Sequence, residues 1–301
     1  MSFASFATAV LLAVTAPQAV QDPTSPLPDV TVSGVRGTET EARLFLEEIS
    51  TEPTHSLSLA RWTTPICLAT ENLREEAAAA LTARIEARAR AVGVVVRPPG
   101  CSPNVTILAT SDGRATATDL VEAYHDRFIA SPGLAQGDEG DLRRFAEAQA
   151  AVRWWTISAL MDDFSGKILI PMWGSPATAV SSRGGGFFGQ DRREGMVTSL
   201  VILDLSRMNG VTDEALGDYL SMVILANIEP ETRAGGYPTI LNLWDSGAVS
   251  TGLTEWDMAY LTALYEADVR MVGAPPIRSL YQRTEMARIM ARELAGDDPA
   301  P

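Results

Sequence analysis

The sequence predicts an α+β fold, in which packed helices cover a mixed, twisted sheet. Apolar residues recur every four positions from Leu73 to Ala89, which is the spacing of the buried stripe of a helix. Short runs rich in β-branched residues, such as "NVTILAT" and "MVTSLVILDLS", predict buried strands between helices. A long and almost wholly apolar helical segment at 212–228 precedes two further helices near the C-terminus.

The first 19 residues have the composition of a secretory signal peptide. An apolar run from Phe6 to Ala16 is followed by small residues, and the first acidic residue is Asp22. No Lys or Arg precedes the run, so a buried helix or a membrane anchor is the alternative. The run is short for a membrane span, and no other segment approaches ~20 uninterrupted apolar residues. We therefore expect an exported protein, periplasmic or extracellular, with no stable membrane span after signal removal.

One main domain is predicted beyond the signal peptide. Residues 20–60 hold prolines and mixed charges, and we expect an extended segment there, with a short helix near 39–49 and little core. From Trp62 onward the apolar residues become regularly spaced, so residues 61–295 are predicted to form a single domain. The acidic, proline-containing residues 296–301 are predicted to be a disordered tail.

Local signals set the expected limits of the elements in the first half of that domain. Thr70 is the expected N-cap of a helix that has acids in its first turn, arginines in its last turns and Gly93 just beyond its end. The elements expected next are strands at 92–98 and 104–110, a helix started by a capping box of Thr116 and Asp119, and a helix at 139–150.

The second half of the domain begins with the clearest hairpin signal of the chain. Aromatic and β-branched residues flank the turn sequence "DDFSG", so residues 152–173 are predicted to form two paired arms. Residues 174–195 are rich in glycine and lack periodicity, which predicts a long mobile loop. The strand "MVTSLVILDLS" then leads into the helix at 212–228, and helices at 254–267 and 279–295 follow.

The two cysteines, Cys67 and Cys101, are 34 positions apart and the chain has no others. In an oxidising compartment such a pair most simply forms a disulfide. Closing that loop would restrict the unfolded chain by about 3–4 kcal/mol in the entropy model. Two unpaired buried thiols are the alternative, because free cysteine is among the most buried residue types.

The charge pattern argues against nucleic-acid binding. The formal net charge is -14, and the positive charges are arginines spread through the chain, with a single lysine at position 167. A polyanion requires a concentrated cationic surface, and the sequence has no dense basic cluster.

The C-terminal third carries a resemblance to a known family. "YPTILNLWD" is similar to the methionine-turn region of the metzincins, and "LTEWDMAYLTALY" is similar to their closing helix. The same pattern resembles uncharacterised exported bacterial proteins, some described as predicted zinc-dependent proteases, which share a "W..P.C" segment like that of Trp62, Pro65 and Cys67. The resemblance implies a zincin-like fold over roughly residues 62–267.

The zinc ligands of that family are missing from the matching positions. A working zincin needs two histidines four apart on one helix, with a glutamate after the first as general base. Those positions are Asp218, Tyr219 and Met222 here. The turn that would carry the family's methionine has Ile240 and Leu241 instead. We therefore expect no catalytic zinc site, no other metal and no cofactor.

The chain has only two histidines, His55 and His125, and neither lies on the 212–228 helix. His125 follows Val121 by four positions and precedes Phe128 by three, at the margin of an apolar face. We expect it to be a partly buried structural histidine rather than a metal ligand.

Our leading functional hypothesis is an exported, non-catalytic scaffold of zincin-like fold, a pseudo-protease. The strand before the long helix, residues 197–205, is expected at the edge of the sheet, where it would bind a peptide or an envelope protein by β-augmentation. The residues expected to contact the added strand are Ser199, Val201 and Leu203.

Two other functions are compatible with the sequence. The protein could be an active hydrolase or peptidase with an unorthodox acidic site that uses Asp204, Asp218 or Asp257, because burial can shift a carboxyl pKa into a useful range. It could also be a purely structural envelope protein. The sequence leaves the substrate or partner and the oligomeric state open.

Overall fold

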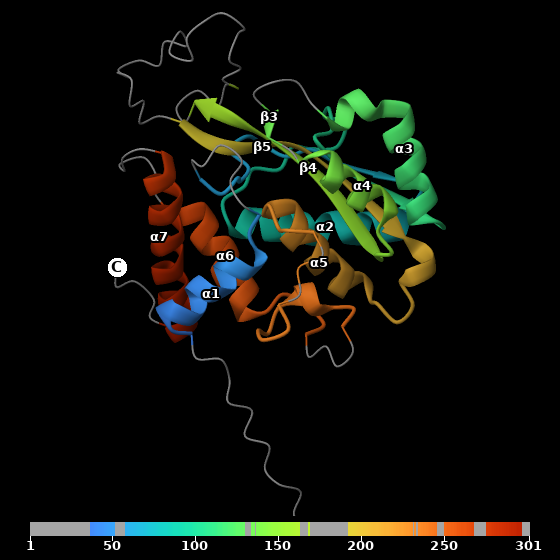
Figure 1. Ribbon diagram of the computed structural model, residues 1–301. Helices are drawn as coiled ribbons and strands as arrows, with labels where there is room; N and C mark the ends of the chain where they lie inside the picture. Colours follow the sequence, from blue (N-terminus) through green and yellow to red (C-terminus); the bar gives the residue numbers. More distant parts are fainter. Residues whose placement is uncertain are drawn as a thin grey trace, which may run out of the picture. The chain divides into compact units, whose positions relative to one another are not determined.

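The computed structural model of the chain describes residues 37–51, 58–129, 134–135, 137–162, 168, 192–230, 232, 234–245, 250–267 and 275–296. All of them belong to one compact unit, residues 35–301. In this part of the chain, seven α-helices and a mixed sheet confirm the predicted α+β class (Figure 1). The predicted signal peptide, residues 1–19, lies outside the described residues.

The helices are α1 (Glu39–Ile49), α2 (Glu75–Ala91), α3 (Gly113–Phe128), α4 (Glu139–Glu147), α5 (Asp213–Leu225), α6 (Glu255–Glu266) and α7 (Pro275–Ala295). The strands are β1 (Leu68–Glu71), β2 (Val105–Thr110), β3 (Leu134–Ala135), β4 (Val152–Asp162) and β5 (Arg192–Asp204). The predictions of α1, α4, α5, α6 and α7 are thus confirmed, with differences of a few residues at their ends. No helix among the described residues has the length and apolar composition needed to cross a membrane.

The described strands form one sheet in the order β1-β2-β5-β4-β3. Strands β1, β2 and β5 run parallel, and β4 runs antiparallel to β5. The two-residue strand β3 pairs antiparallel with β4 at Ser158 and Ala159 only. In the centre of the sheet, Val201 of β5 lies between Ile107 of β2 and Trp154 of β4.

The expected position of residues 197–205 at the sheet edge is wrong. Ser199 and Leu203 of β5 pair with β2 on one side and with β4 on the other, as does Val201 between them. Their backbone groups are therefore occupied within the sheet. Val201, Ile202 and Leu203 are fully buried, and a continuous apolar run of this kind is typical of a central strand covered on both faces.

Of the predicted hairpin at 152–173, the structure describes mainly the first arm. β4 pairs along its length with β5, while the second arm is described only at Ile168, which forms an antiparallel bridge with Met161. Most of the predicted loop at 174–195 lies outside the described residues. Its last four residues belong to β5, which begins at Arg192.

Each face of the sheet carries its own apolar cluster, because alternate residues of a strand point to opposite faces. On one face Trp154 and Val201 pack with α2 and α5 in the larger cluster. On the other face Trp155 and Ile202 pack with α3 and α4. Figure 1 shows α3 and α4 on one side of the long strands, with α2 and α5 on the other.

Helix α1 is part of the main core, which corrects the expected extended segment at residues 20–60. Phe45 is fully buried, and its ring contacts those of Tyr237, Trp256 and Tyr260. The charged residues that made this segment look peripheral lie on the solvent side of the helix. The domain therefore begins before residue 61.

Two predicted helix starts are wrong by several residues. Thr70, the expected N-cap of α2, lies in β1 and pairs with Ile107, so the helix starts after the strand has ended. The expected capping box of Thr116 and Asp119 lies inside α3, whose N-cap is Asp112. In both places the end of the preceding strand, and not the capping signal, determines where the helix begins: α2 starts later than predicted and α3 starts earlier.

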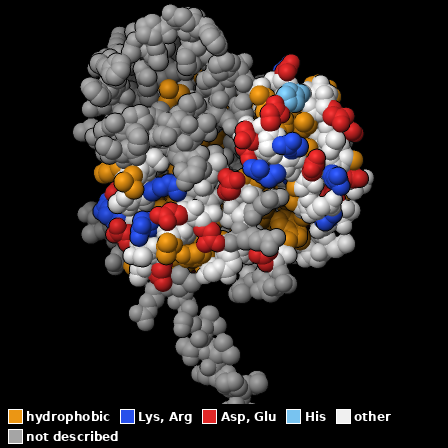
Figure 2. All heavy atoms as spheres, in the orientation of Figure 1, with side chains coloured by type: hydrophobic (Ala, Val, Ile, Leu, Met, Phe, Trp, Pro, Cys, Tyr) orange, Lys and Arg blue, Asp and Glu red, His pale blue; other side chains and the backbone are white. Residues whose placement is uncertain are grey.

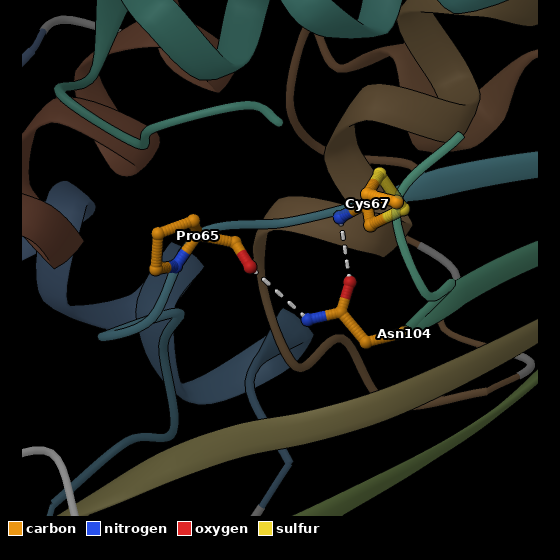
Figure 3. The surroundings of a disulfide bond; sticks show 4 residues. Pro65, Cys67 and Asn104 are labelled. Carbon is orange, nitrogen blue, oxygen red and sulfur yellow. Dashed lines mark hydrogen bonds between the residues drawn. A yellow bond between two sulfur atoms is a disulfide. The ribbon is translucent and has the colours of Figure 1, made fainter. Parts of the chain in front are cut away.

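The predicted disulfide is present: Cys67 and Cys101 are bonded, with 6.1 Å between their Cα atoms. It joins the residue before β1 to the connection that leads into β2. Asn104 ties the same region together, since its side-chain amide donates to the Pro65 carbonyl at 3.2 Å and its side-chain oxygen accepts from the Cys67 amide at 2.7 Å (Figure 3). The bond therefore fixes the start of the β1–β2 pair.

We predict that replacing both cysteines by alanine lowers the free energy of unfolding by about 3–4 kcal/mol, because the unfolded chain is no longer cross-linked. Urea unfolding of the wild type and the double variant, each with and without dithiothreitol, measures this. Reductant should destabilise only the wild type. A double variant as stable as the oxidised wild type would contradict the prediction.

Candidate functional site

Helix α5 carries Asp218, Tyr219 and Met222, the three positions that the sequence resemblance matched to the catalytic residues of a zincin. Every residue from Ala215 to Leu225 is buried, so the helix has no solvent-facing side over most of its length. Its N-cap, Thr212, accepts a hydrogen bond from the Ala215 amide. The prediction of a helix buried on most of its circumference is confirmed.

Asp218 is the only charged residue in the buried stretch of α5, and two arginines of α2 neutralise it. Arg84 and Arg88 each donate two hydrogen bonds to its carboxylate, at 2.7–3.1 Å. The Leu253 amide donates a further bond at 3.0 Å. Although burial opposes ionisation, these donors lower the pKa of Asp218 to about 2. The carboxylate therefore stays ionised near neutral pH, with both oxygens bound to structural partners.

Gly217 allows α2 to approach α5 closely enough for this contact. A Cβ atom at position 217 would lie 2.8 Å from Cγ of Arg84, which is a severe overlap. Leu81, one turn earlier on α2, lies near the same point. The glycine thus lets the Arg84 side chain cross the surface of α5 and reach Asp218 on the next position.

Tyr219 and Met222 are the other two candidate positions of α5, and both lie in the core. The Tyr219 ring packs edge-on against Trp154 and Trp244, with centroid distances of 6.4 and 4.6 Å. Burial raises its phenol pKa well above the usual value. Met222 is fully buried in the main cluster. Both side chains act as core residues.

The turn that contains Ile240 and Leu241 packs against α5. Ile240 and Leu241 begin a short 3₁₀ helix, Ile240–Asn242, and both are buried. Asp257 of α6 holds this turn, because its carboxylate accepts from the Ile240 amide at 2.8 Å and from the Thr239 hydroxyl at 2.5 Å. Burial raises the pKa of Asp257.

Other residues of the resemblance stabilise the C-terminal end of α5. The Trp62 indole donates to the Ile224 carbonyl at 2.7 Å, and the Tyr265 hydroxyl donates to the Leu225 carbonyl at 2.7 Å. The last carbonyls of a helix have no hydrogen-bond donor within the helix, so the two side chains supply the missing donors. The residues that carry the resemblance thus hold α5 in place.

The remaining candidate residues of the sequence do not gather near α5. His125 is exposed and lies 3.2 Å from Glu139, so the expectation of a partly buried histidine is wrong; it sits on α3, where nothing described covers it. His55 lies outside the described residues. Asp204 accepts from the Gly113 amide and from Ser206. Among the described residues, no three His, Cys, Asp or Glu side chains form a cluster able to hold a metal ion.

One hollow in the described surface lies along the outer edge of β4. This "β4 groove" has a volume of about 580 Å³ and is lined by β4 from Val152 to Thr156, by α4, by the end of α1 and by residues 227–230. The size falls within the range of about 300–1,000 Å³ that is usual for ligand pockets. The sequence did not indicate it, because its walls come from four separate segments.

The backbone of β4 faces this groove with unpaired groups. The Ala151 carbonyl accepts from the Asp204 amide of the neighbouring strand. Because antiparallel ladder bonds alternate, the amides and carbonyls of Val152, Trp154 and Thr156 point away from β5. Among the described residues, β3 is the one strand on that side, and it pairs only further along. Within the part of the chain that the structure describes, no strand therefore pairs with the edge at 152–156, and we call this edge open.

The opposite wall is a short pair of extended segments. Residues 49–51 and 227–229 form an antiparallel bridge at Ser50 and Ile228, with the Thr51 amide bonded to the Asn227 carbonyl. The Trp154 indole donates to the Ile228 carbonyl at 3.2 Å and so links this wall to β4. The Thr51 hydroxyl oxygen is buried without a hydrogen-bond partner in the described structure.

Arg153 fixes the third wall, helix α4. Its side chain is only 3% exposed and donates to the carbonyls of Phe145 and Ala146 at the end of α4, and to that of Ala150. A guanidinium at a helix C-terminus satisfies free carbonyls and is favoured by the helix dipole. Burial lowers the pKa of Arg153.

Comparison of the chain with protein-family models, with curated proteins and with solved structures finds no match.

We predict that Asp218→Asn lowers the free energy of unfolding by about 3 kcal/mol, because it leaves two arginines beside a buried, uncharged partner. Chemical denaturation measures the change. Asp119→Asn, at an exposed position on α3, is the matched control and should alter stability by less than about 0.5 kcal/mol. Equal, small effects of the two changes would show that the ion pair contributes little.

The same contact predicts a pH dependence. The pKa of Asp218 is lower in the folded state than its ordinary value of 3.8, so the folded protein binds fewer protons in acid than the unfolded chain does. Its stabilisation, about 2–3 kcal/mol, is complete above pH 5 and is lost as the pH falls toward 2. The stability difference between wild type and Asp218→Asn should therefore shrink on acidification. A difference that does not change between pH 7 and pH 3 would contradict this.

Proposed function

We propose that the protein is an exported, non-catalytic scaffold of zincin-like fold that binds an extended peptide against the outer edge of β4. The observation that carries the proposal is the β4 groove, in which the open strand edge at 152–156 faces a concave, partly apolar space. Strand addition to such an edge gives affinity through backbone hydrogen bonds and specificity through alternate side chains.

The absence of catalysis is inferred from the contacts of the three candidate residues on α5. The carboxylate of Asp218 is bound by Arg84, Arg88 and a backbone amide, and its lowered pKa makes it a poor proton acceptor near neutral pH. Tyr219 and Met222 are packed as core residues. The zincin resemblance itself rests on the sequence motifs and on the order of the elements.

The dimensions of the groove fit a short extended segment. From Val152 to Thr156 a strand advances about 13 Å, which is long enough to pair with about four residues of a bound peptide. An added strand at this edge would run beside β4 and be enclosed by α4 and by the 49–51 and 227–229 wall. An open edge of this kind is normally covered in a folded protein, because it would otherwise pair with other chains.

Export is part of the same proposal. The disulfide between Cys67 and Cys101 is typical of proteins that fold in an oxidising compartment, and the first 19 residues have the composition of a signal peptide. The peptide would then belong to a periplasmic or extracellular protein.

We predict that Thr156→Pro weakens binding of an eight-residue peptide, acetyl-Thr-Val-Thr-Gln-Gln-Thr-Val-Thr-amide, by about tenfold. The substitution removes one outward amide, a loss of about 1–1.5 kcal/mol, and leaves the ladder to β5 intact because that amide does not take part in it. Isothermal titration calorimetry on the mature protein measures the affinity.

Two controls separate this effect from damage to the fold. Thr156→Val removes the hydroxyl that contacts Ser199 but keeps the amide, so it should bind like the wild type. N-methylation of alternate residues of the peptide removes donors without changing the protein and should also weaken binding. No binding to the wild type up to about 1 mM, or equal binding by methylated and unmethylated peptides, would refute the proposal.

A further inference from the structure

Acidic side chains dominate the walls of the β4 groove. Glu47 and Glu48 at the end of α1, Glu229 on the facing segment and Asp141 of α4 all line it. The basic residues of the lining are Arg144 and Arg153. Figure 2 shows acidic and basic side chains interspersed on this face of the molecule, near α1 and near α3 and α4, so the acidic character is confined to the groove lining itself.

Both arginines are already engaged. Arg144 makes a close ion pair with Asp141, one turn earlier on α4, so the pair presents little net charge. The Arg153 guanidinium is buried against the carbonyls at the end of α4. Neither arginine forms a described ion pair with Glu47 or Glu48, the two residues that we call the α1 wall.

The α1 wall keeps its negative charge. Glu47 is paired only with the exposed Arg43, at 3.6 Å, and an exposed pair of this kind contributes less than about 1 kcal/mol. Glu48 is exposed and makes no ion pair among the described residues. A strand bound at β4 would therefore lie beside carboxylates that lack strong cationic partners.

Resting on the proposed peptide-binding function, we infer that the bound segment is cationic and places a lysine or arginine side chain opposite the α1 wall. A Lys or Arg there would gain Coulomb attraction, and its aliphatic stem would cover the apolar surface around Trp154. An acidic side chain at the same place would be repelled by Glu47 and Glu48.

Three eight-residue peptides test this: the Gln-Gln peptide above and versions with Lys-Lys or Glu-Glu at its centre. Adjacent residues of a strand point to opposite faces, so one central charge points toward the wall in either register. We expect the Lys-Lys peptide to bind about tenfold more tightly than the Glu-Glu peptide at low salt. About 1 M NaCl should remove most of this preference, because it shortens the screening length to about 3 Å.

Variants of the protein test which residues cause the preference for the Lys-Lys peptide. A Glu47→Gln, Glu48→Gln double change should reduce the preference for the Lys-Lys over the Glu-Glu peptide to about twofold. A Glu75→Gln, Glu76→Gln double change, which removes two exposed charges outside the groove, is the matched control for the overall net charge and should leave the preference intact.

The outcomes distinguish the inference from the function on which it rests. If all three peptides bind equally, and Thr156→Pro still weakens them, the groove binds peptides without charge selection and the inference is refuted. A preference that falls equally with the Glu47→Gln, Glu48→Gln change and with the Glu75→Gln, Glu76→Gln control would assign it to the overall charge and also refute the inference. Failure of all three peptides to bind the wild type would refute the proposed function itself.

Discussion

The burial of α5 on its whole circumference is the constraint on which the rest of the structure depends. A helix enclosed in this way must have its charged residue and its terminal carbonyls satisfied by other elements. Arg84 and Arg88 of α2 satisfy Asp218, while Trp62 and Tyr265 satisfy the C-terminal carbonyls. The contacts tie α2, α6 and the segment before β1 to one helix, so segments far apart in the sequence are ordered around it.

The order of the strands then determines which strand edge has no paired neighbour among the described residues. β5 is covered on both faces and both edges, so it serves as the centre of the fold rather than as a docking strand. The open edge is displaced to β4, the next strand outward. There the wall of residues 49–51 and 227–229 lies opposite the outward amides of β4, so the strand edge lines a groove. This wall directly follows α1 and the end of α5 in the chain. Helix α5, which is buried on all sides, thus helps to position one wall of the β4 groove.

Helix periodicity, which is a short-range pattern, predicted most of the helices and the class of the fold, and the disulfide could be predicted because the chain has only two cysteines. The features that the sequence did not predict depend on how the strands pair in the folded protein. Thr70 looked like a cap but was taken into β1, and the run ending at Leu203 looked like an edge strand but received β4 as a second neighbour. Gly217 gave no signal, since only the approach of Arg84 explains it. The groove could not be predicted for the same reason: the open amides depend on the register of β4 with β5.

Amide hydrogen exchange along β4, with and without the Lys-Lys peptide, tests the central claim most directly. The amides of Arg153, Trp155 and Ile157 face β5 and should be protected in both states. Those of Trp154 and Thr156 should exchange quickly in the free protein and become protected when the peptide is bound. Protection of the outward amides in the free protein, or no change on adding a peptide that binds, would show that the edge of β4 is not the binding surface.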